Sequence, residues 1–283
     1  MIGRNIIEDN HEARALALAS IYFAGSGHPG GSLSCIDILA CLLESPSFFR
    51  NGIDKFVLSK GHGCPALYAV AAKIGWIEKS DITLLRKLGS PLQGHPDVRF
   101  TPWVEASTGS LGQGFSIAAG MALGFRHQNQ QARVYAMLGD GELQEGQVWE
   151  AAMFAAHHDL SNLCAIIDYN KLQSDDYNSN IMALEPLRDK WLAFNWHVIE
   201  VDGHDVAQIE SSLLEFSSMD AKPTVIIAHT IKGKGVSFME GVPAWHGSVK
   251  LRREELEQAL RELAVSGQDL TSYLDGSIWG VNA

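Results

Sequence analysis

Three strongly apolar runs between residues 134 and 228 constrain the fold of the chain more than any other feature. They read Val-Tyr-Ala-Met-Leu, Leu-Cys-Ala-Ile-Ile and Thr-Val-Ile-Ile-Ala, and helical patterns separate them. Because none of them alternates apolar with polar residues, each strand is expected to be buried on both faces, as in parallel sheets covered by helices. With right-handed crossovers, the pattern predicts a doubly wound α/β fold with a mostly parallel sheet and helices on both faces.

The spacing of apolar residues predicts further elements along the chain. Strands are expected at 56–59, 133–138, 163–168, 196–201 and 223–228. Helices are expected at 5–24, 34–43, 65–74, 81–88, 111–128, 146–158, 186–194, 205–217 and 252–264, the last of them on the surface. A glycine-rich turn, 25–31, joins the first two helices. Because no linker, repeat or sharp change in composition divides the 283 residues, we expect a single domain, 1–283.

The composition argues against several classes of partner. Hydrophobic residues make up 46% and charged residues 19% of the chain, as in ordinary globular proteins. The net charge of −11 argues against a nucleic acid or an anionic membrane as partner. No apolar run is long enough to span a membrane, and the start of the chain lacks the pattern of a signal peptide. The cysteines are expected to be reduced core thiols of a cytoplasmic protein: Cys35, Cys41, Cys64 and Cys164.

An aspartate and an asparagine follow two neighbouring apolar runs. Asp140 stands between two glycines after the run 134–138, and Asn170 lies just past the run 163–167. Neighbouring strands of a parallel sheet end side by side, so the two side chains are expected to converge. Carboxylate and amide oxygens suit Mg²⁺, and the glycines leave backbone N–H groups open to phosphate oxygens. The sequence therefore predicts a magnesium-diphosphate site.

Four of the eleven histidines lie in glycine-bounded loops, namely His28, His62, His95 and His246. The other seven fall in predicted helices, strands or polar turns and are expected to be structural or exposed. The spacing of the four does not suit a zinc site. Neutral imidazoles suit proton exchange with hydroxyl groups and hydrogen bonding to phosphate oxygens near neutral pH. We expect all four loops on the ligand side of one sheet.

Other glycine-rich segments have simpler interpretations. Residues 25–30 match Gly-x-Gly-x-x-Gly but follow a helix and contain a proline, so they do not predict a nicotinamide site. Residues 108–114 open a long helix, where glycines allow close packing and backbone amides attract an anion or the edge of a cofactor. Lys232 and Lys234 are expected to be solvated, with phosphate binding as the weaker alternative. A metal-dependent phosphohydrolase would need more carboxylates around the metal.

Seven motifs follow one another over nearly the whole chain: Gly-His-Pro-Gly-Gly (27–31), Leu-Ser-Lys-Gly-His (58–62), Gly-His-Pro-Asp (94–97), Thr-Gly-Ser-Leu-Gly-Gln-Gly (108–114), Leu-Gly-Asp-Gly-Glu-Leu-Gln-Glu-Gly (138–146), Asp-Tyr-Asn-Lys-Leu (168–172) and Trp-His-Gly (245–247). Together they resemble the N-terminal, diphosphate-binding domain of the transketolase family. The resemblance implies that the protein uses thiamine diphosphate and a divalent metal, Mg²⁺ or else Ca²⁺ or Mn²⁺. It also implies transfer of a two-carbon ketol unit from a ketose phosphate to an aldose phosphate.

The resemblance also implies roles for single residues. The metal ligands would be two side chains and one backbone carbonyl: Asp140, Asn170 and Leu172. The cofactor contacts would come from His62, Gly109, Leu111, Gly141, Glu145, Asn170 and His246. Among these, Gly109 and Leu111 would contact the thiazolium and aminopyrimidine rings, and Glu145 would link the two cofactor sites of a dimer. The residues that bind sugar hydroxyls and move protons would be His28, His95 and His246.

Full-length transketolases continue into an aminopyrimidine-binding domain, whose glutamate protonates the pyrimidine ring of the cofactor. This chain stops near the first domain boundary, so it is similar to the N-terminal subunit of a split transketolase. The resemblance then implies a C-terminal partner subunit that carries the second domain, in an α2β2 assembly. Alternatives are a subunit related to deoxyxylulose phosphate synthase or to another thiamine diphosphate enzyme, and a non-catalytic scaffold that binds the cofactor. The Leu-Gln-Glu-Gly sequence favours transketolase over the synthase, and the sugar-facing histidines argue against a scaffold.

Overall fold

A five-stranded parallel sheet forms the centre of residues 6–277, which are the part of the chain that the computed structural model describes. The strands are β1 (Lys55–Leu58), β2 (Val134–Gly139), β3 (Leu163–Tyr169), β4 (His197–Asp202) and β5 (Thr224–His229). Their order across the sheet is β1-β2-β3-β5-β4. In this register Gly139 pairs with Asp168, and Tyr169 pairs with His229. The parallel sheet predicted from the apolar runs is confirmed.

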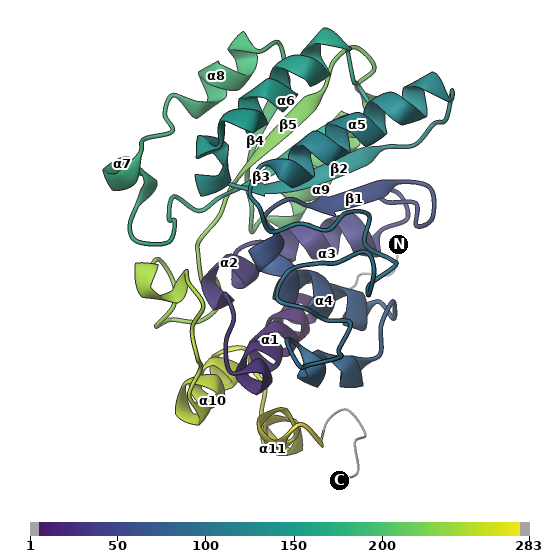
Figure 1. Ribbon diagram of the computed structural model, residues 1–283. Coiled ribbons are helices and arrows are strands. Elements are labelled where there is room, and N and C mark those ends of the chain that lie inside the picture. The colour runs from purple at the N-terminus through teal and green to yellow at the C-terminus, as the bar shows by residue number, and fades with distance from the viewer. Residues whose placement is uncertain (1–5, 278–283) are drawn as a thin grey trace.

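Helices cover both faces of this sheet (Figure 1). One face is covered by α5 (Gln113–His127), α6 (Gly146–His157) and α8 (Leu187–Ala193), and the other by α3 (Ile36–Glu44) and α9 (Val206–Ser218). Successive strand residues alternate between the two cores. Tyr135 and Met137 pack with the α3 and α9 side, whereas Val134 and Ala136 pack with the α5 and α6 side. The runs are apolar throughout because each face has its own layer of helices, which confirms the doubly wound fold.

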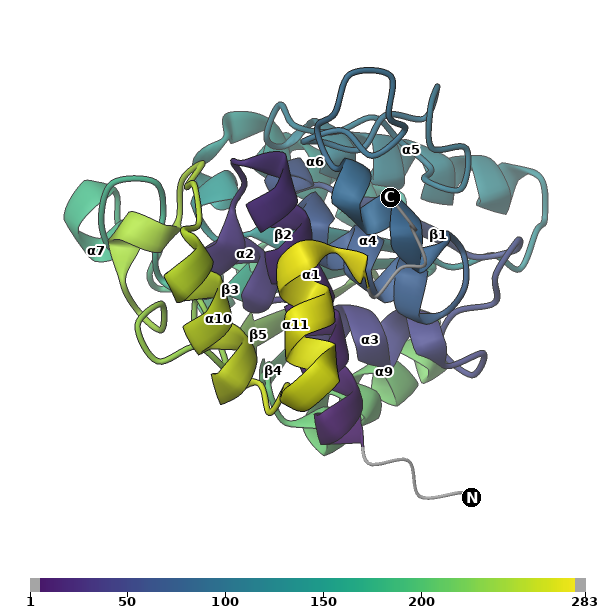
Figure 2. The same cartoon turned by 90° about the horizontal axis from the view of Figure 1, so that it is seen from below.

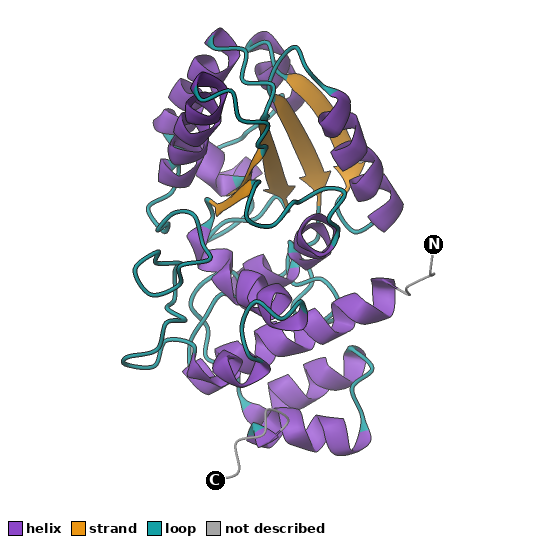
Figure 3. Ribbon diagram, turned by 90° about the vertical axis from the view of Figure 1, so that its right-hand side faces the viewer, coloured by secondary structure: helices purple, strands orange, loops and turns teal. Residues whose placement is uncertain are grey.

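The remaining helices gather beyond the carboxyl ends of the strands. They are α1 (Ile6–Ala24), α2 (Pro29–Leu33), α4 (Cys64–Lys73), α10 (Arg253–Glu262) and α11 (Gly267–Asp275), and the single turn α7 (Asn178–Ile181) lies after β3. Figure 3 shows the strand arrowheads pointing toward this mainly helical half. From below, α11 lies over α1 with α10 beside it (Figure 2). Among the described helices, none has the length and apolar character needed to cross a membrane.

Most of the predicted elements are found within two residues of their expected bounds. The helix expected at 81–88 is wrong, because a 3₁₀ helix (Lys79–Leu84) takes its place. Ile82 is the buried residue of this 3₁₀ helix, and Leu85, also buried, directly follows its end. The helical path ends at Leu85, which has a non-helical ψ of 128°, and Arg86 after it adopts a left-handed φ of 59°.

Two other departures concern short helices. The glycine-rich turn expected at 25–31 is partly wrong, because α2 begins inside it at Pro29, a residue suited to the first position of a helix. The apolar pattern does not predict α7 or α11 either. Other expectations hold: α10 lies at the surface with Leu256 and Leu260 buried, and all four cysteines are free and buried.

Gly114 lets α5 approach the end of β1, and this contact leads to a prediction. A Cβ at Gly114 would lie 2.7 Å from the Cα of Ser59, whereas a Cβ at Gly120, on the exposed side of α5, meets nothing within 4 Å. We expect Gly114→Ala to lower the free energy of unfolding by about 1–3 kcal/mol through overpacking. Gly120→Ala is the matched control and should raise it by up to about 1 kcal/mol. Urea unfolding of both variants checks this, and equal stabilities would contradict the close approach.

Candidate functional site

Asp140 and Asn170 lie side by side at the carboxyl end of the sheet. Asp140 directly follows β2 and Asn170 directly follows β3, and these strands are neighbours. The Asp140 carboxylate accepts hydrogen bonds from the backbone N–H of Gly141, at 2.8 Å, and from that of Lys171. The structure thus brings the two predicted metal ligands together at the ends of β2 and β3, as expected for neighbouring parallel strands. We call this place the corner of Asp140 and Asn170.

The third predicted ligand, the carbonyl of Leu172, faces the same corner. The Oδ1 atom of Asn170 accepts a hydrogen bond from the Leu172 N–H at 3.1 Å, which shapes the turn. The Leu172 carbonyl accepts a hydrogen bond from Lys232 Nζ at 2.7 Å. A cavity of about 70 Å³ lies among these groups, and Asp140, Gly141, Leu111, His62 and His246 also line it.

Lys232 corrects one expectation from the sequence. It is 1% exposed rather than solvated, and its ammonium contacts both the Leu172 carbonyl and Nδ1 of His246. Burial lowers the pKa of Lys232 to about 7, and burial raises the pKa of Asp140 to about 6. Lys234 behaves as expected, since it is partly exposed and paired with Glu240. A buried ammonium beside an aspartate favours an anionic ligand that could share the same corner.

A second buried lysine joins the ends of three elements. Lys60, just after β1, donates to the Gly31 carbonyl at 2.8 Å and forms an ion pair with Asp168 at the end of β3. Asp168 also accepts hydrogen bonds from Ser34 and Thr230. Burial alone would raise the pKa of Asp168, yet the charge of Lys60 lowers it. The sequence does not predict a site role for Lys60 or Asp168. Their contacts hold together the segments that follow β1 and β5, the end of β3 and the segment around α2.

Three of the four loop histidines stand in a row. The ring centroids of His28 and His62 are 5.3 Å apart, and those of His62 and His246 are 5.7 Å apart. Burial, with nearby cations adding to its effect, lowers the pKa of His28 to about 4 and that of His246 to about 3. Burial also lowers the pKa of His62 well below its usual value. All three imidazoles are therefore neutral at pH 7, the form that exchanges protons with hydroxyls or donates from a ring N–H.

His95 reaches the site from another direction. It is more exposed than the other three, and burial together with the charge of Arg86 lowers its pKa. A Cβ at Gly109 would lie 2.9 Å from Cδ2 of His95, and Gly109 has a φ of 141°. Any other residue at this position would be strained and would also displace the imidazole. The predicted cofactor contact Gly109 and the predicted sugar contact His95 therefore adjoin one another.

Glu142 anchors the loop that contains Gly109 and Leu111. Its buried carboxylate accepts hydrogen bonds from Ser59 Oγ, from Gly112 N at 2.8 Å and from Gly139 N at 3.0 Å. Burial raises the pKa of Glu142. The sequence predicts no role for this glutamate. Its place two residues after Asp140 is nevertheless a signal that it lines the same cavity.

Glu145 is set apart from the other predicted cofactor residues. It caps the start of α6 without a side-chain hydrogen bond to the helix, and its side chain is exposed. It does not line the cavity around Asp140. This position suits a contact with another polypeptide better than a contact within the chain.

Several buried polar atoms at the site lack a hydrogen-bond partner in the described residues. They include His28 Nδ1, Thr108 Oγ1 and Gln173 Nε2. Such atoms cost free energy when they stay unpaired, so they are expected to find partners in a bound molecule. Together with the Asp140 carboxylate and the buried side chains of Lys60 and Lys232, which line the same cavity, they fit a ligand that carries phosphate oxygens and a metal ion.

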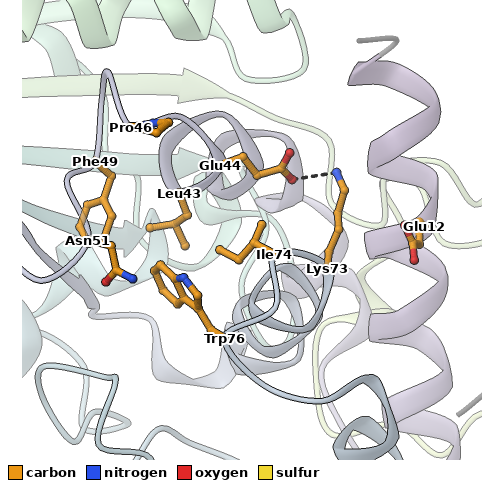
Figure 4. A pocket seen from close by; sticks show the side chains of 9 residues that line it. All are labelled: Glu12, Leu43, Glu44, Pro46, Phe49, Asn51, Lys73, Ile74 and Trp76. Atoms are coloured by element: carbon orange, nitrogen blue, oxygen red, sulfur yellow. Dashed lines mark hydrogen bonds and ion pairs between the residues drawn. The ribbon is translucent and has the colours of Figure 1, made fainter.

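A larger cavity lies elsewhere in the molecule. Its volume is about 660 Å³, and Lys73, Glu44 and Trp76 are among its lining residues (Figure 4). Lys73 ends α4, whereas His62 lies just before its start, so the length of that helix separates this cavity from the site. Figure 4 shows Lys73 directed at Glu44, and their atoms are 2.7 Å apart. The larger cavity contains none of the loop histidines and does not belong to the candidate site.

Comparisons with known proteins agree with this geometry. Residues 7–270 match the family model described as transketolase, thiamine diphosphate binding domain. The 6-deoxy-6-sulfo-D-fructose transketolase subunit SqwG of Clostridium sp. (strain MSTE9) is 44% identical, over 92% of this chain and 98% of its own. One of the separately named subunits of the apulose-4-phosphate transketolase of Phocaeicola vulgatus is 39% identical, over 86% of this chain and 88% of its own. Human transketolase is 41% identical, but the match covers 39% of the human protein.

Solved structures give the same result. The transketolase from Leishmania mexicana superposes with a TM-score of 0.84 at 28% identity, over 97% of this chain and 44% of that one. The transketolase from Campylobacter jejuni superposes equally well, over 97% of this chain and 46% of that one. The chain thus spans nearly all of the matched subunits but less than half of these longer enzymes. It belongs to the transketolase family, in which it corresponds to the thiamine diphosphate binding domain.

Proposed function

We propose that this protein is the N-terminal subunit of a split transketolase. It would transfer a two-carbon ketol unit from a ketose phosphate to an aldose phosphate with thiamine diphosphate and a divalent metal. One observation carries the proposal: the predicted metal ligands and three of the loop histidines meet at the same edge of the sheet. The corner of Asp140 and Asn170 suits a metal-bound diphosphate, and neutral His28, His62 and His246 stand beside it. The full match to relatives named as separate subunits supports the split arrangement.

Different residues at the corner would bind the metal, the diphosphate and the rings of the cofactor. Asp140, Asn170 and the Leu172 carbonyl would bind Mg²⁺, with Ca²⁺ or Mn²⁺ as alternatives, since all three offer oxygen ligands. Diphosphate contacts would come from Gly141, His62 and His246, and ring contacts from Gly109 and Leu111. When bound, thiamine diphosphate supplies the carbon nucleophile that attacks the ketose carbonyl. Lys232, between the Leu172 carbonyl and His246, would neutralise phosphate charge.

The histidines would handle the sugar. His28, His95 and His246 would hydrogen-bond the sugar hydroxyls and move protons as bonds to the ketol unit form and break. Their lowered pKa values keep the imidazoles neutral at pH 7, so each ring can accept a hydrogen bond at one nitrogen and donate one from the other. A scaffold that only bound the cofactor would need neither His28 nor His95, which do not line the cavity around Asp140.

The partner would be a C-terminal subunit that carries the aminopyrimidine-binding domain and its glutamate. We propose an α2β2 assembly, in which this chain acts as one domain and Glu145 links the two cofactor sites. The exposed position of Glu145 at the start of α6 supports such a contact. Four free, buried cysteines agree with a cytoplasmic setting, where thiols stay reduced.

The names of the relatives point to the charge of the donor. A relative at 44% identity is named for a sulfonated ketose and another, at 39%, for a ketose phosphate, which favours an anionic ketose in either case. The assay should offer the complex with its partner one phosphorylated, one sulfonated and one uncharged ketose, each with an aldose phosphate. We expect the acceptor to gain a two-carbon unit, detected by mass spectrometry, from an anionic donor. Absence of transfer from all three donors would overturn the proposed activity.

Replacing Asp140 tests the cofactor site separately from turnover. Asp140→Ala removes the single carboxylate predicted to touch the metal. The affinity for thiamine diphosphate at fixed Mg²⁺ should therefore fall more than about 100-fold, which exceeds the loss typical for residues that only hydrogen-bond a metal ligand. Calorimetric titration of the complex measures this. Asp220→Ala, an exposed loop residue before β5, is the control and should bind normally. Unchanged affinity in Asp140→Ala would rule out the metal site.

A further inference from the structure

Arg86 touches the three loops that carry the sugar-facing histidines. Its Nη1 atom donates to Ser26 Oγ at 3.1 Å and approaches Ser248 Oγ at 3.5 Å. Its guanidinium also lies against Gly94, where a Cβ would be 2.7 Å from Nε and 2.8 Å from Cζ of the arginine. Each of the three contacts is one or two residues away from a histidine: His28, His246 and His95, respectively.

The backbone around Arg86 aims the side chain at these loops. Arg86 has a φ of 59°, a conformation that side-chain-bearing residues seldom adopt, and its N–H donates to the Leu92 carbonyl at 2.8 Å. A hydrogen-bonded bridge between Gly27 and Val249 already ties the His28 loop to the His246 loop. Arg86 connects the His95 loop to this pair, because its guanidinium reaches Gly94 as well.

The charge of Arg86 also acts on the same rings. After burial, Arg86 is the largest contributor to the lowered pKa of both His28 and His95. The pKa of His28 is also lowered by His95 and by two buried cations, Lys60 and Lys232, and its ring lies beside that of His62. For His95, the charge that lowers the pKa is that of Arg86.

We propose that Arg86 is a positioning residue, which holds the loops of His28, His95 and His246 in one arrangement. This inference rests on the proposed function and adds a residue to it. Arg86 would not contact the cofactor, because its contacts are with Ser26, Ser248 and Gly94. None of these residues belongs to the segments that contain Asp140, Gly141 and Asn170. Its loss should therefore affect turnover and its pH dependence without affecting the binding of thiamine diphosphate.

The test compares Arg86→Gln and Arg86→Lys in the complex with the partner subunit. Arg86→Gln removes the charge and most of the contacts, so kcat should fall about 10–100-fold through misplaced histidines. Because the pKa values of His28 and His95 should rise, the acidic limb of kcat/KM should move to higher pH. Arg86→Lys keeps the charge but cannot make the same set of contacts, so it should lose kcat while its acidic limb stays in place.

Two controls separate this role from a general loss of structure. Lys87→Gln removes a neighbouring cation that contacts the Phe23 carbonyl and none of the histidine loops, and it should leave kcat and the pH profile unchanged. If Arg86→Gln does not fold, the double variant Ser26→Ala with Ser248→Ala removes two contacts and leaves the charge. It should lower kcat without a shift in the pH profile.

Histidine ring titration by NMR provides a readout that needs no ketol transfer. In Arg86→Gln, the ring signals of His28 and His95 should titrate at higher pH than in the parent chain, while those of exposed His127 should not change. If the parent complex shows no ketol transfer, the proposed function fails, yet this titration still tests Arg86. Wild-type kcat together with unchanged titration of His28 and His95 would overturn the inference.

Discussion

Replacing either His28 or His95 by alanine is expected to lower the turnover of the assembled enzyme by about 10²–10⁴-fold, the range for lost proton transfer by a positioned side chain. The two residues approach the crevice from separate loops, and His95 packs against Gly109. Neither one lines the corner of Asp140 and Asn170. The affinity for thiamine diphosphate and the unfolding midpoint should therefore stay near those of the parent protein.

The comparison uses steady-state kinetics and calorimetric titration on the same preparations. His127→Ala is the matched control, because His127 lies exposed in the last turn of α5 and should be replaceable without effect. His246→Ala should lower both turnover and cofactor affinity, since His246 lines the corner and contacts Lys232. If His28→Ala and His95→Ala lose their fold while the turnover of any folded fraction stays normal, both residues have structural roles instead.

Much of the fold could be predicted from the sequence because its signals are local. The runs that form β2, β3 and β5 are apolar on nearly every residue, and each is buried between two helical layers. Asp140 and Asn170 could be placed together for a similar reason, since each follows a strand whose neighbours are set by the parallel order. Both predictions needed only the rule that parallel strands end at one edge.

The features that escaped prediction depend on contacts between distant segments. The burial of Lys232 depends on Leu172 and His246, and that of Lys60 depends on Asp168, more than one hundred residues away along the chain. A lysine in a glycine-rich loop carries no local sign of such partners. Arg86 was likewise placed in a helix, because the apolar spacing around it does not reveal a left-handed residue.

The structure brings most of the predicted site residues close together, and their roles stay predictions. The predicted metal ligands lie around one cavity, and three histidines stand in a row. Glu145, in contrast, is exposed at the start of α6. The variants of Asp140, His28 and His95 test each role separately.

The dependence on a partner subunit should produce the largest effect. We propose that the cofactor is held between a diphosphate-binding surface on this chain, which matches the thiamine diphosphate binding domain, and an aminopyrimidine-binding surface on the partner. The side of the crevice with Gly109 and Leu111, together with the exposed Glu145 at the start of α6, is thus proposed to be an interface. Without the partner, the cofactor has contacts on one side only, so the chain alone should bind it weakly and show no ketol transfer.

The decisive measurement is ketol transfer by the purified 283-residue chain with and without its partner. Each sample contains thiamine diphosphate, Mg²⁺, an anionic ketose and an aldose phosphate, and the partner alone serves as control. We predict no detectable transfer by either polypeptide alone, and turnover together with tight cofactor binding once the two are mixed. Robust turnover by this chain without any partner would contradict the assignment as one half of a split transketolase.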